Sequence, residues 1–145
     1  LVGATGRNLD IRSKYKHHHY FGVQTAKTLL GLERQDASKA IIVEGMTDFL
    51  NAYDKITKLQ LDYNVYATLT CSMSEWQARE LVDTSKPLYF CWDQDAAANN
   101  KREVSLAKVK DAYFLFDCKW GFKNNDGSIK DIGDLSYDEF HQIFK

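Results

Sequence analysis

Cysteine and proline are scarce in this sequence. The three cysteines, Cys71, Cys91 and Cys118, are odd in number, far apart and without paired CxxC spacing. They argue against a disulfide framework and against a zinc ribbon. Cys91 lies within an apolar run and is expected to be a small core residue. The single proline, Pro87, stands at the start of a predicted strand, where its missing N–H does least harm.

The sequence also lacks an excess of charge and a long apolar run. Nineteen basic residues stand against 20 acidic residues, so the formal net charge of the 145 residues is -1. No overall basic field indicates a nucleic-acid partner, and any polyanion would be met locally or through bound metal. No stretch approaches the roughly 20 apolar residues that span a bilayer, and no leader opens the chain. We expect one cytoplasmic domain, and a start at Leu1 rather than Met suggests a piece of something longer.

Four apolar runs rich in β-branched and aromatic residues are predicted to be strands: 39–44, 63–69, 87–93 and 111–117. We expect them to be buried on both faces and hence parallel. Helical spacing of apolar residues lies between and after them, over 47–59, 74–83, 96–109 and the C-terminal tail. This alternation predicts an α/β fold with a parallel sheet flanked by helices. The first 38 residues instead suggest strands and turns, then a short helix near 23–31.

Acidic residues fall where the predicted strands end. Glu44 ends the first strand, Asp93 and Asp95 end the third, and others come shortly after strand ends: Asp48, Asp131 and Asp134. Ligands of open parallel sheets bind beyond the carboxyl ends of the strands, so we expect one acidic cluster at that edge. Carboxylates are the ligands that Mg²⁺ prefers, and two such ions can hold the oxygens of a phosphoryl transfer.

A plainer interpretation makes the same acids helix caps. Asp95 would cap 96–108, and Asp48 would lie in a first turn that favours negative charge. For any single acid this interpretation is the simpler one. The whole set, spread over three strand ends, favours metal.

Three stretches, IIVEGMTDFLNA, CWDQDAAANN and KDIGD, resemble the three signatures of a Toprim domain, the metal-binding fold of bacterial-type primases, topoisomerases and some nucleases. The flanking LVGATGR and KYKHHHYFGVQTAKTLLGL are similar to the segment before Toprim in DnaG-type primases. The resemblance divides the chain into 1–38, the end of a primase N-terminal subdomain, and 39–145, a Toprim (Rossmann-like) domain.

The resemblance implies a DNA primase that joins NTPs into RNA primers on single-stranded DNA with Mg²⁺, for which Mn²⁺ can substitute, beside a fused or separate replicative helicase. Glu44 would act near the chemistry and Asp93 with Asp95 would bind metal, supported by three further acids: Asp48, Asp131 and Asp134. Three basic residues would lie near nucleotide or template: Arg7, Lys14 and Lys130. Gln94 departs from the usual glycine, and the spacing of the last two acids is more like that of phage primases.

Two rival functions stay open. A Toprim nuclease would use the same acids to activate water, and a non-catalytic Toprim module would only bind protein or DNA. The primase-like segment 1–38 disfavours the nuclease, and the intact acids disfavour the binding module.

Other conspicuous residues have ordinary explanations. His17, His18 and His19 could bind metal but favour a partly exposed turn, and Trp92 favours core packing over base stacking. A helical basic face that could touch DNA is more simply a solvated surface. It consists of Lys101, Arg102, Lys108 and Lys110.

Overall fold

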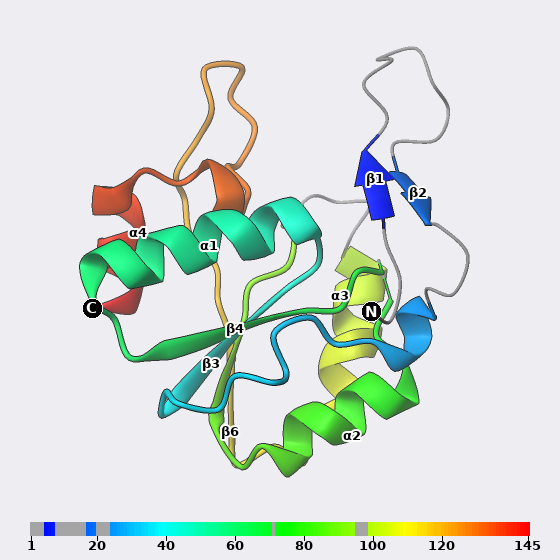
Figure 1. Cartoon of the computed structure of the whole chain (residues 1–145). Coiled ribbons are helices and arrows are strands. Elements are labelled where there is room, and N and C mark those ends of the chain that lie inside the picture. Colours follow the sequence, from blue (N-terminus) through cyan, green and yellow to red (C-terminus); the bar gives the residue numbers. More distant parts are fainter. Residues whose placement is uncertain (1–4, 8–16, 20–23, 71, 95–98) are drawn as a thin grey trace.

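A four-stranded parallel sheet forms the centre of the computed structural model, which describes residues 5–7, 17–19, 24–70, 72–94 and 99–145 (Figure 1). The order of its strands is β4-β3-β5-β6. Their bounds are β3 Lys39–Val43, β4 Tyr63–Ala67, β5 Pro87–Phe90 and β6 Phe114–Asp117. Each lies within one of the four predicted runs, and all three pairings are parallel. The α/β prediction is confirmed.

Helices cover both faces of this sheet, as the crossovers require. Those on one face are α1 (Met46–Leu59) and α4 (Tyr137–Phe144). Those on the other are α2 (Glu75–Asp83) and α3 (Asn99–Lys108). Both α2 and α4 begin with a capping box, in which Ser74 and Ser136 accept the N–H of the residue three positions on.

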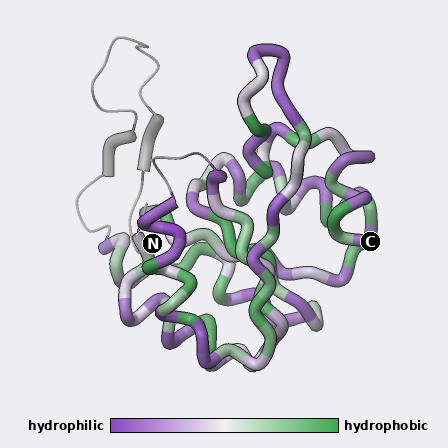
Figure 2. The backbone as a smooth tube through the Cα atoms, turned by 180° about the vertical axis from the view of Figure 1, so that it is seen from behind, coloured by the Kyte–Doolittle hydropathy of each residue, from purple (hydrophilic) through white to green (hydrophobic). Residues whose placement is uncertain are grey.

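The alternation of side chains along the strands divides the core in two. Ile41 and Val43 of β3 pack toward α1 and α4, whereas Ala40 and Ile42 pack toward α2. Viewed from behind, the central strands are mainly hydrophobic, whereas the hairpin that stands away from the coloured body is mostly hydrophilic (Figure 2). Cys91 and Trp92 lie in this core, as predicted. None of the described helices is long and apolar enough to cross a membrane.

The two edges of the sheet differ, and one prediction about them is wrong. At the β4 edge all five residues are buried, and Leu30 forms an antiparallel bridge with Ala67. At the β6 edge Phe114 and Phe116 are 51% and 44% exposed, although this strand was expected to be buried on both faces. Only Leu115 of this strand is partly buried, whereas the other three residues are exposed.

The described parts of the N-terminal segment form a small ribbon. Strands β1 (Thr5–Arg7) and β2 (His17–His19) pair antiparallel. The histidine triplet is therefore a strand, not the expected turn. The short helix predicted near 23–31 is one 3-10 turn, η1 (Thr25–Lys27). Residues 24–38 are bonded to both α2 and the sheet: Gln77 of α2 donates to the carbonyl oxygens of Thr25 and Thr28, and Leu30 pairs with Ala67 of β4.

Candidate functional site

The carboxyl ends of β3 and β5 bring two predicted site residues to one edge of the sheet. These strands are neighbours, and the N–H of Cys91 donates to the carbonyl of Ile42 at 2.8 Å just beyond their last register pair. Glu44 directly follows β3 and Asp93 comes three residues after β5. Both are half-buried. Asp95, the third predicted catalytic residue, lies outside the described residues.

Asp48 lies in the first turn of α1, directly after the β3 end, and its carboxylate accepts backbone hydrogen bonds from Gly45 and Gly133. Burial raises the pKa of Asp48, and the negative charges of Asp131 and Asp134 raise it further. The two N–H groups act in the opposite direction. Asp48 therefore lies in the first helical turn, as the helix-cap interpretation expects. It is also close enough to two other predicted acids to feel their negative charge.

The last two acids belong to a short turn that returns to the start of α1. Asp131 precedes the 3-10 turn η2 (Ile132–Asp134), which Asp134 ends. Lys55 of α1, although buried, donates from its Nζ to the carbonyl of Gly133 at 3.0 Å. Contacts from both ends of α1 thus hold η2 in place. Asp131 and Asp134 lie near enough to Asp48 for their charges to raise its pKa. That all six acids form one metal-binding cluster stays a prediction.

The predicted basic residues have different surroundings. Lys130 is held by Glu139, since its Nζ lies 2.9 Å from both carboxylate oxygens. Arg7 ends β1, where its backbone pairs with His17, and Lys14 lies outside the described residues. The four basic residues considered for a helical face do not share one surface, since only Lys101 and Lys110 are exposed. Arg102 is only 2% exposed, and Lys108 donates to the carbonyl of Met73.

Sequence reasoning missed the partner of Arg102, which is Asp117 at the end of β6. It also missed a hairpin over 119–131, whose strands meet in a bridge between Lys123 and Ile129 and which stands away from the body of the fold (Figure 1). Gln94 ties this hairpin to the acid-bearing segment, because its Oε1 accepts the N–H of Trp120 at 3.3 Å. A glycine at position 94 could not make this contact.

The chemistry of the acids fits a hard divalent cation. Burial raises the pKa of Asp48, repulsion by Asp131 and Asp134 raises it further, and a cation would relieve that repulsion. Carboxylate oxygens are the usual ligands of Mg²⁺. Among the residues that the structure describes, no three His, Cys, Asp or Glu side chains lie close enough together to hold a metal ion as they stand. Closing such a site would need Asp95 or a movement of the described acids.

The fold is shared with solved primase structures. The zinc-binding and RNA polymerase domains of the Aquifex aeolicus primase match with a TM-score of 0.73 and 19% identity over 99% of this chain and 36% of that one. A DNA primase domain from Pseudomonas aeruginosa matches with a TM-score of 0.67 and 22% sequence identity, over 93% of this chain and 42% of that one. A DnaG catalytic domain bound to single-stranded DNA matches with a TM-score of 0.58 and 19% sequence identity, over 75% of this chain and 35% of that one.

This chain therefore spans less than half the length of each of these primase structures. Comparison with curated protein sequences found no match. A family model described as Toprim-like matches residues 41–132. This region contains the whole sheet except the first two residues of β3, together with α1, α2 and α3. The match covers well over half of the chain and includes five of the six predicted acids, so the chain belongs to the Toprim-like family.

Proposed function

We propose that this chain is the catalytic part of a DnaG-type DNA primase, which synthesises RNA primers from NTPs on single-stranded DNA. The observation that carries the proposal is that two neighbouring strands of a Toprim-like sheet, β3 and β5, lead at their carboxyl ends into Glu44 and Asp93. Near the start of α1, Asp131 and Asp134 lie close enough to Asp48 for their charges to raise its pKa. The match to the Aquifex primase over 99% of the chain adds support, because it includes the segment before the Toprim-like region. A minimal nuclease has no clear use for that segment.

In this proposal the acids have separate tasks. Asp93 and Asp95 would bind Mg²⁺, Glu44 would act beside them, and three acids would support them: Asp48, Asp131 and Asp134. When bound, the ion would neutralise charge on the NTP triphosphate and lower the pKa of the attacking hydroxyl. The protein's own contribution would be to hold these carboxylates on rigid strand ends and to keep Asp48 oriented by two backbone N–H groups.

Basic residues would have a smaller role than in most nucleic-acid proteins. An NTP arrives with its own cation, so a chain of net charge -1 can accept it without a large basic patch. Arg7, Lys14 and Lys130 are the residues that we propose for nucleotide or template. Lys130 would have to leave Glu139 to serve this role. Segment 1–38 would belong to a primase N-terminal subdomain and 39–145 to the Toprim domain, in a cytoplasmic protein that works with a replicative helicase.

The proposal is tested by following Mn²⁺ binding and primer synthesis in the same protein. The chain, its Asp93→Asn variant and an Asp126→Asn control would be titrated with Mn²⁺ and monitored by the electron paramagnetic resonance signal of the free ion. Asp126 is an exposed acid of the 119–131 hairpin and makes the same change of charge away from the strand ends. We expect the chain and the control to bind Mn²⁺ and Asp93→Asn to lose binding at least tenfold.

The longer protein that carries this sequence would then be given single-stranded DNA and labelled NTPs, beside a DNA-cleavage assay. Primer products that disappear in Asp93→Asn support a primase. Metal-dependent cleavage without primers identifies a nuclease instead, and equal Mn²⁺ binding by Asp93→Asn rules out the assigned site.

A further inference from the structure

The side chain of Arg102 extends from α3 into the interior, where it forms hydrogen bonds with groups at the ends of two strands. Its Nη2 donates to the carbonyl oxygens of Phe90 at 3.4 Å and Cys118 at 2.9 Å, and it also contacts the Asp117 carboxylate. Its Nη1 donates to the carbonyl oxygen of Trp92. The guanidinium is therefore bonded to the last residues of β5 and β6, to Cys118 directly after β6 and to Trp92 two residues after β5.

These contacts explain why a buried charge is tolerated here. A buried guanidinium without partners would destabilise the fold strongly, but the Asp117 carboxylate neutralises it and the carbonyl oxygens accept from its Nη1 and Nη2. Only its Nε has no acceptor within the described part of the chain. The bond also gives the Trp92 carbonyl oxygen a hydrogen-bond donor, because this residue lies beyond the last register pair of the sheet.

Arg102 lies in the helix that follows the segment bearing Asp93, and it bonds to the residue that precedes this segment. Trp92 directly precedes Asp93, and the segment 93–98 leads from there into α3, which carries Arg102. One side chain therefore joins the two ends of the segment that bears Asp93 and Asp95. Fastening both ends limits where the first carboxylate can lie, because Asp93 is one residue from a bonded carbonyl.

We infer that Arg102 is a positioning residue for the metal site at the β5 end, holding Asp93 in place through the carbonyl of Trp92. This inference rests on the proposed function, because that proposal assigns metal binding to Asp93. The alternative is that Arg102 only stabilises the packing of α3. The two roles differ in what a substitution changes: metal affinity and order at residues 91–94 in one case, overall stability alone in the other.

The experiment compares Arg102→Lys with a matched control, Gln77→Met. Gln77 is also fully buried, and its Nε2 also donates to three carbonyl oxygens, those of Thr25, Thr28 and Thr68. It fastens the end of β4, which bears none of the predicted acids. The lysine keeps a positive charge beside Asp117 but cannot donate in the planar fork that reaches several carbonyls at once. Both variants are expected to lower Tm.

Two measurements separate the roles. The dissociation constant for Mn²⁺ is expected to rise about 10- to 100-fold in Arg102→Lys and to stay within about twofold of the parent in Gln77→Met. Hydrogen exchange of a peptide covering 91–94, followed without metal, is expected to quicken only in Arg102→Lys. Should Arg102→Lys fail to fold, Asp117→Asn weakens the same contact with a side chain of equal shape and is expected to give the same pattern with smaller changes.

The outcomes also separate the two proposals. If the parent chain binds no Mn²⁺ through Asp93, the proposed function fails and the role of Arg102 fails with it. If the parent binds through Asp93 but Arg102→Lys shows parental affinity and exchange with a lowered Tm, only the positioning role is overturned, and Arg102 is then a packing residue.

Discussion

Asp48 and Gly133 are in close contact: a Cβ added at Gly133 would lie 2.8 Å from the Asp48 Oδ1, so the carboxylate or η2 would have to shift. The N–H of Gly133 donates to the same carboxylate. This contact joins the start of α1 to η2, the two elements that carry Asp48, Asp131 and Asp134. A glycine at position 133 therefore leaves room for this contact, which holds Asp48 beside the turn that carries Asp131 and Asp134.

Gly133→Ala should accordingly destabilise the chain. The methyl group would push η2 away from Asp48 and from Asn51, whose Nδ2 would be 3.2 Å away. Overpacking of this kind costs about 1–3 kcal/mol in the free energy of unfolding, which urea denaturation would measure. Gly121→Ala is the control, since a Cβ there would meet nothing within 4 Å. Equal stability of the two variants would show that η2 moves aside freely.

Asp48→Asn should show a pH-dependent difference in stability. Burial and the charges of Asp131 and Asp134 raise the pKa of Asp48 above 3.8, so the folded state takes up its proton more readily than the unfolded state. The cost of the ionised carboxylate is therefore absent below pH 3.8 and complete above the folded-state pKa. In EDTA, the Tm of Asp48→Asn relative to the parent should rise over this interval. A constant difference from pH 4 to 7 would contradict the shift.

Glu139→Gln should show the opposite dependence. The hydrogen-bonded Lys130 ammonium holds the pKa of Glu139 below 4.5, so the ion pair stabilises the fold above that pH. This contribution is lost as the pH falls through the folded-state pKa. Urea unfolding should find the parent more stable than Glu139→Gln at pH 7 and the two alike in strong acid. Glutamine can still accept the N–H of Ser136, so the capping box remains.

Salt provides the control for that pair. Lys130 and Glu139 are both partly exposed, so raising the ionic strength should shrink their difference at pH 7. A difference that persists in high salt and in acid would come from the helix cap rather than from the ion pair.

The local patterns in the sequence were sufficient for the sheet, but not for what covers or reaches into it. The apolar runs predict all four strands, and Ser74-Glu75-Trp76-Gln77 predicts the capping box that starts α2. In contrast, the run 111–117 is as apolar as the others, yet Phe114 and Phe116 remain exposed because no described element lies over them. Periodicity reports which side chains are apolar and not whether a neighbour arrives to cover them.

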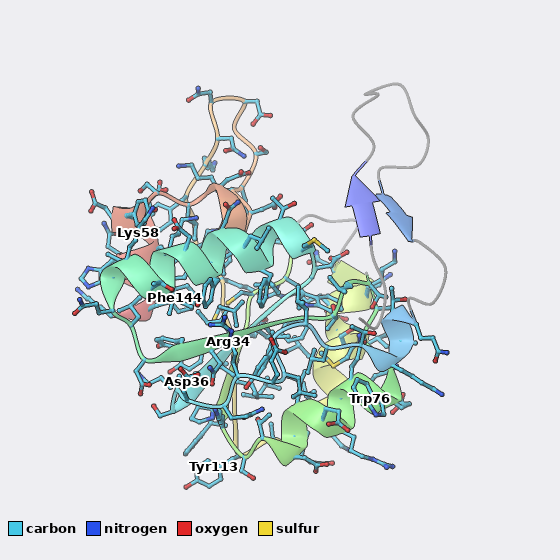
Figure 3. The ribbon with its side chains drawn as sticks, in the orientation of Figure 1. Arg34, Asp36, Lys58, Trp76, Tyr113 and Phe144 are labelled. Atoms are coloured by element: carbon cyan, nitrogen blue, oxygen red, sulfur yellow. The ribbon has the colours of Figure 1, made fainter. Side chains whose placement is uncertain are left out.

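The labelled side chains illustrate the same limit. Phe144 lies between α4 and the sheet, whereas Tyr113, at the start of the β6 edge, projects away from the body of the fold (Figure 3). Arg102 shows the same limit for a charged side chain, whose burial could not be predicted from the local sequence. Its helix was predicted, but charged residues on a helix normally face water, so burial followed only from Asp117, which is 15 positions away in sequence. Pairing over that separation depends on the sheet and is invisible in local spacing.

Cys91 and Cys118 should form a disulfide when the chain is oxidised. They follow the register pair Phe90↔Asp117 of neighbouring strands, and each thiol donates to the carbonyl oxygen two residues before it, that of Tyr89 for Cys91 and that of Phe116 for Cys118. Neighbouring strands lie about 4.8 Å apart, within the Cα separation of about 4.4–6.8 Å that a disulfide spans. Burial raises the pKa of the Cys91 thiol, so little thiolate is available and the reaction should be slow at neutral pH and faster in alkali.

Incubation with oxidised glutathione would remove two thiol protons and two electrons and lower the mass by about 2 Da. Peptide mapping should place the bond between these two cysteines, and Cys118→Ser should abolish it. A mixed disulfide with glutathione that persists on Cys118 would instead show that the two sulfur atoms cannot reach bonding geometry within the folded sheet.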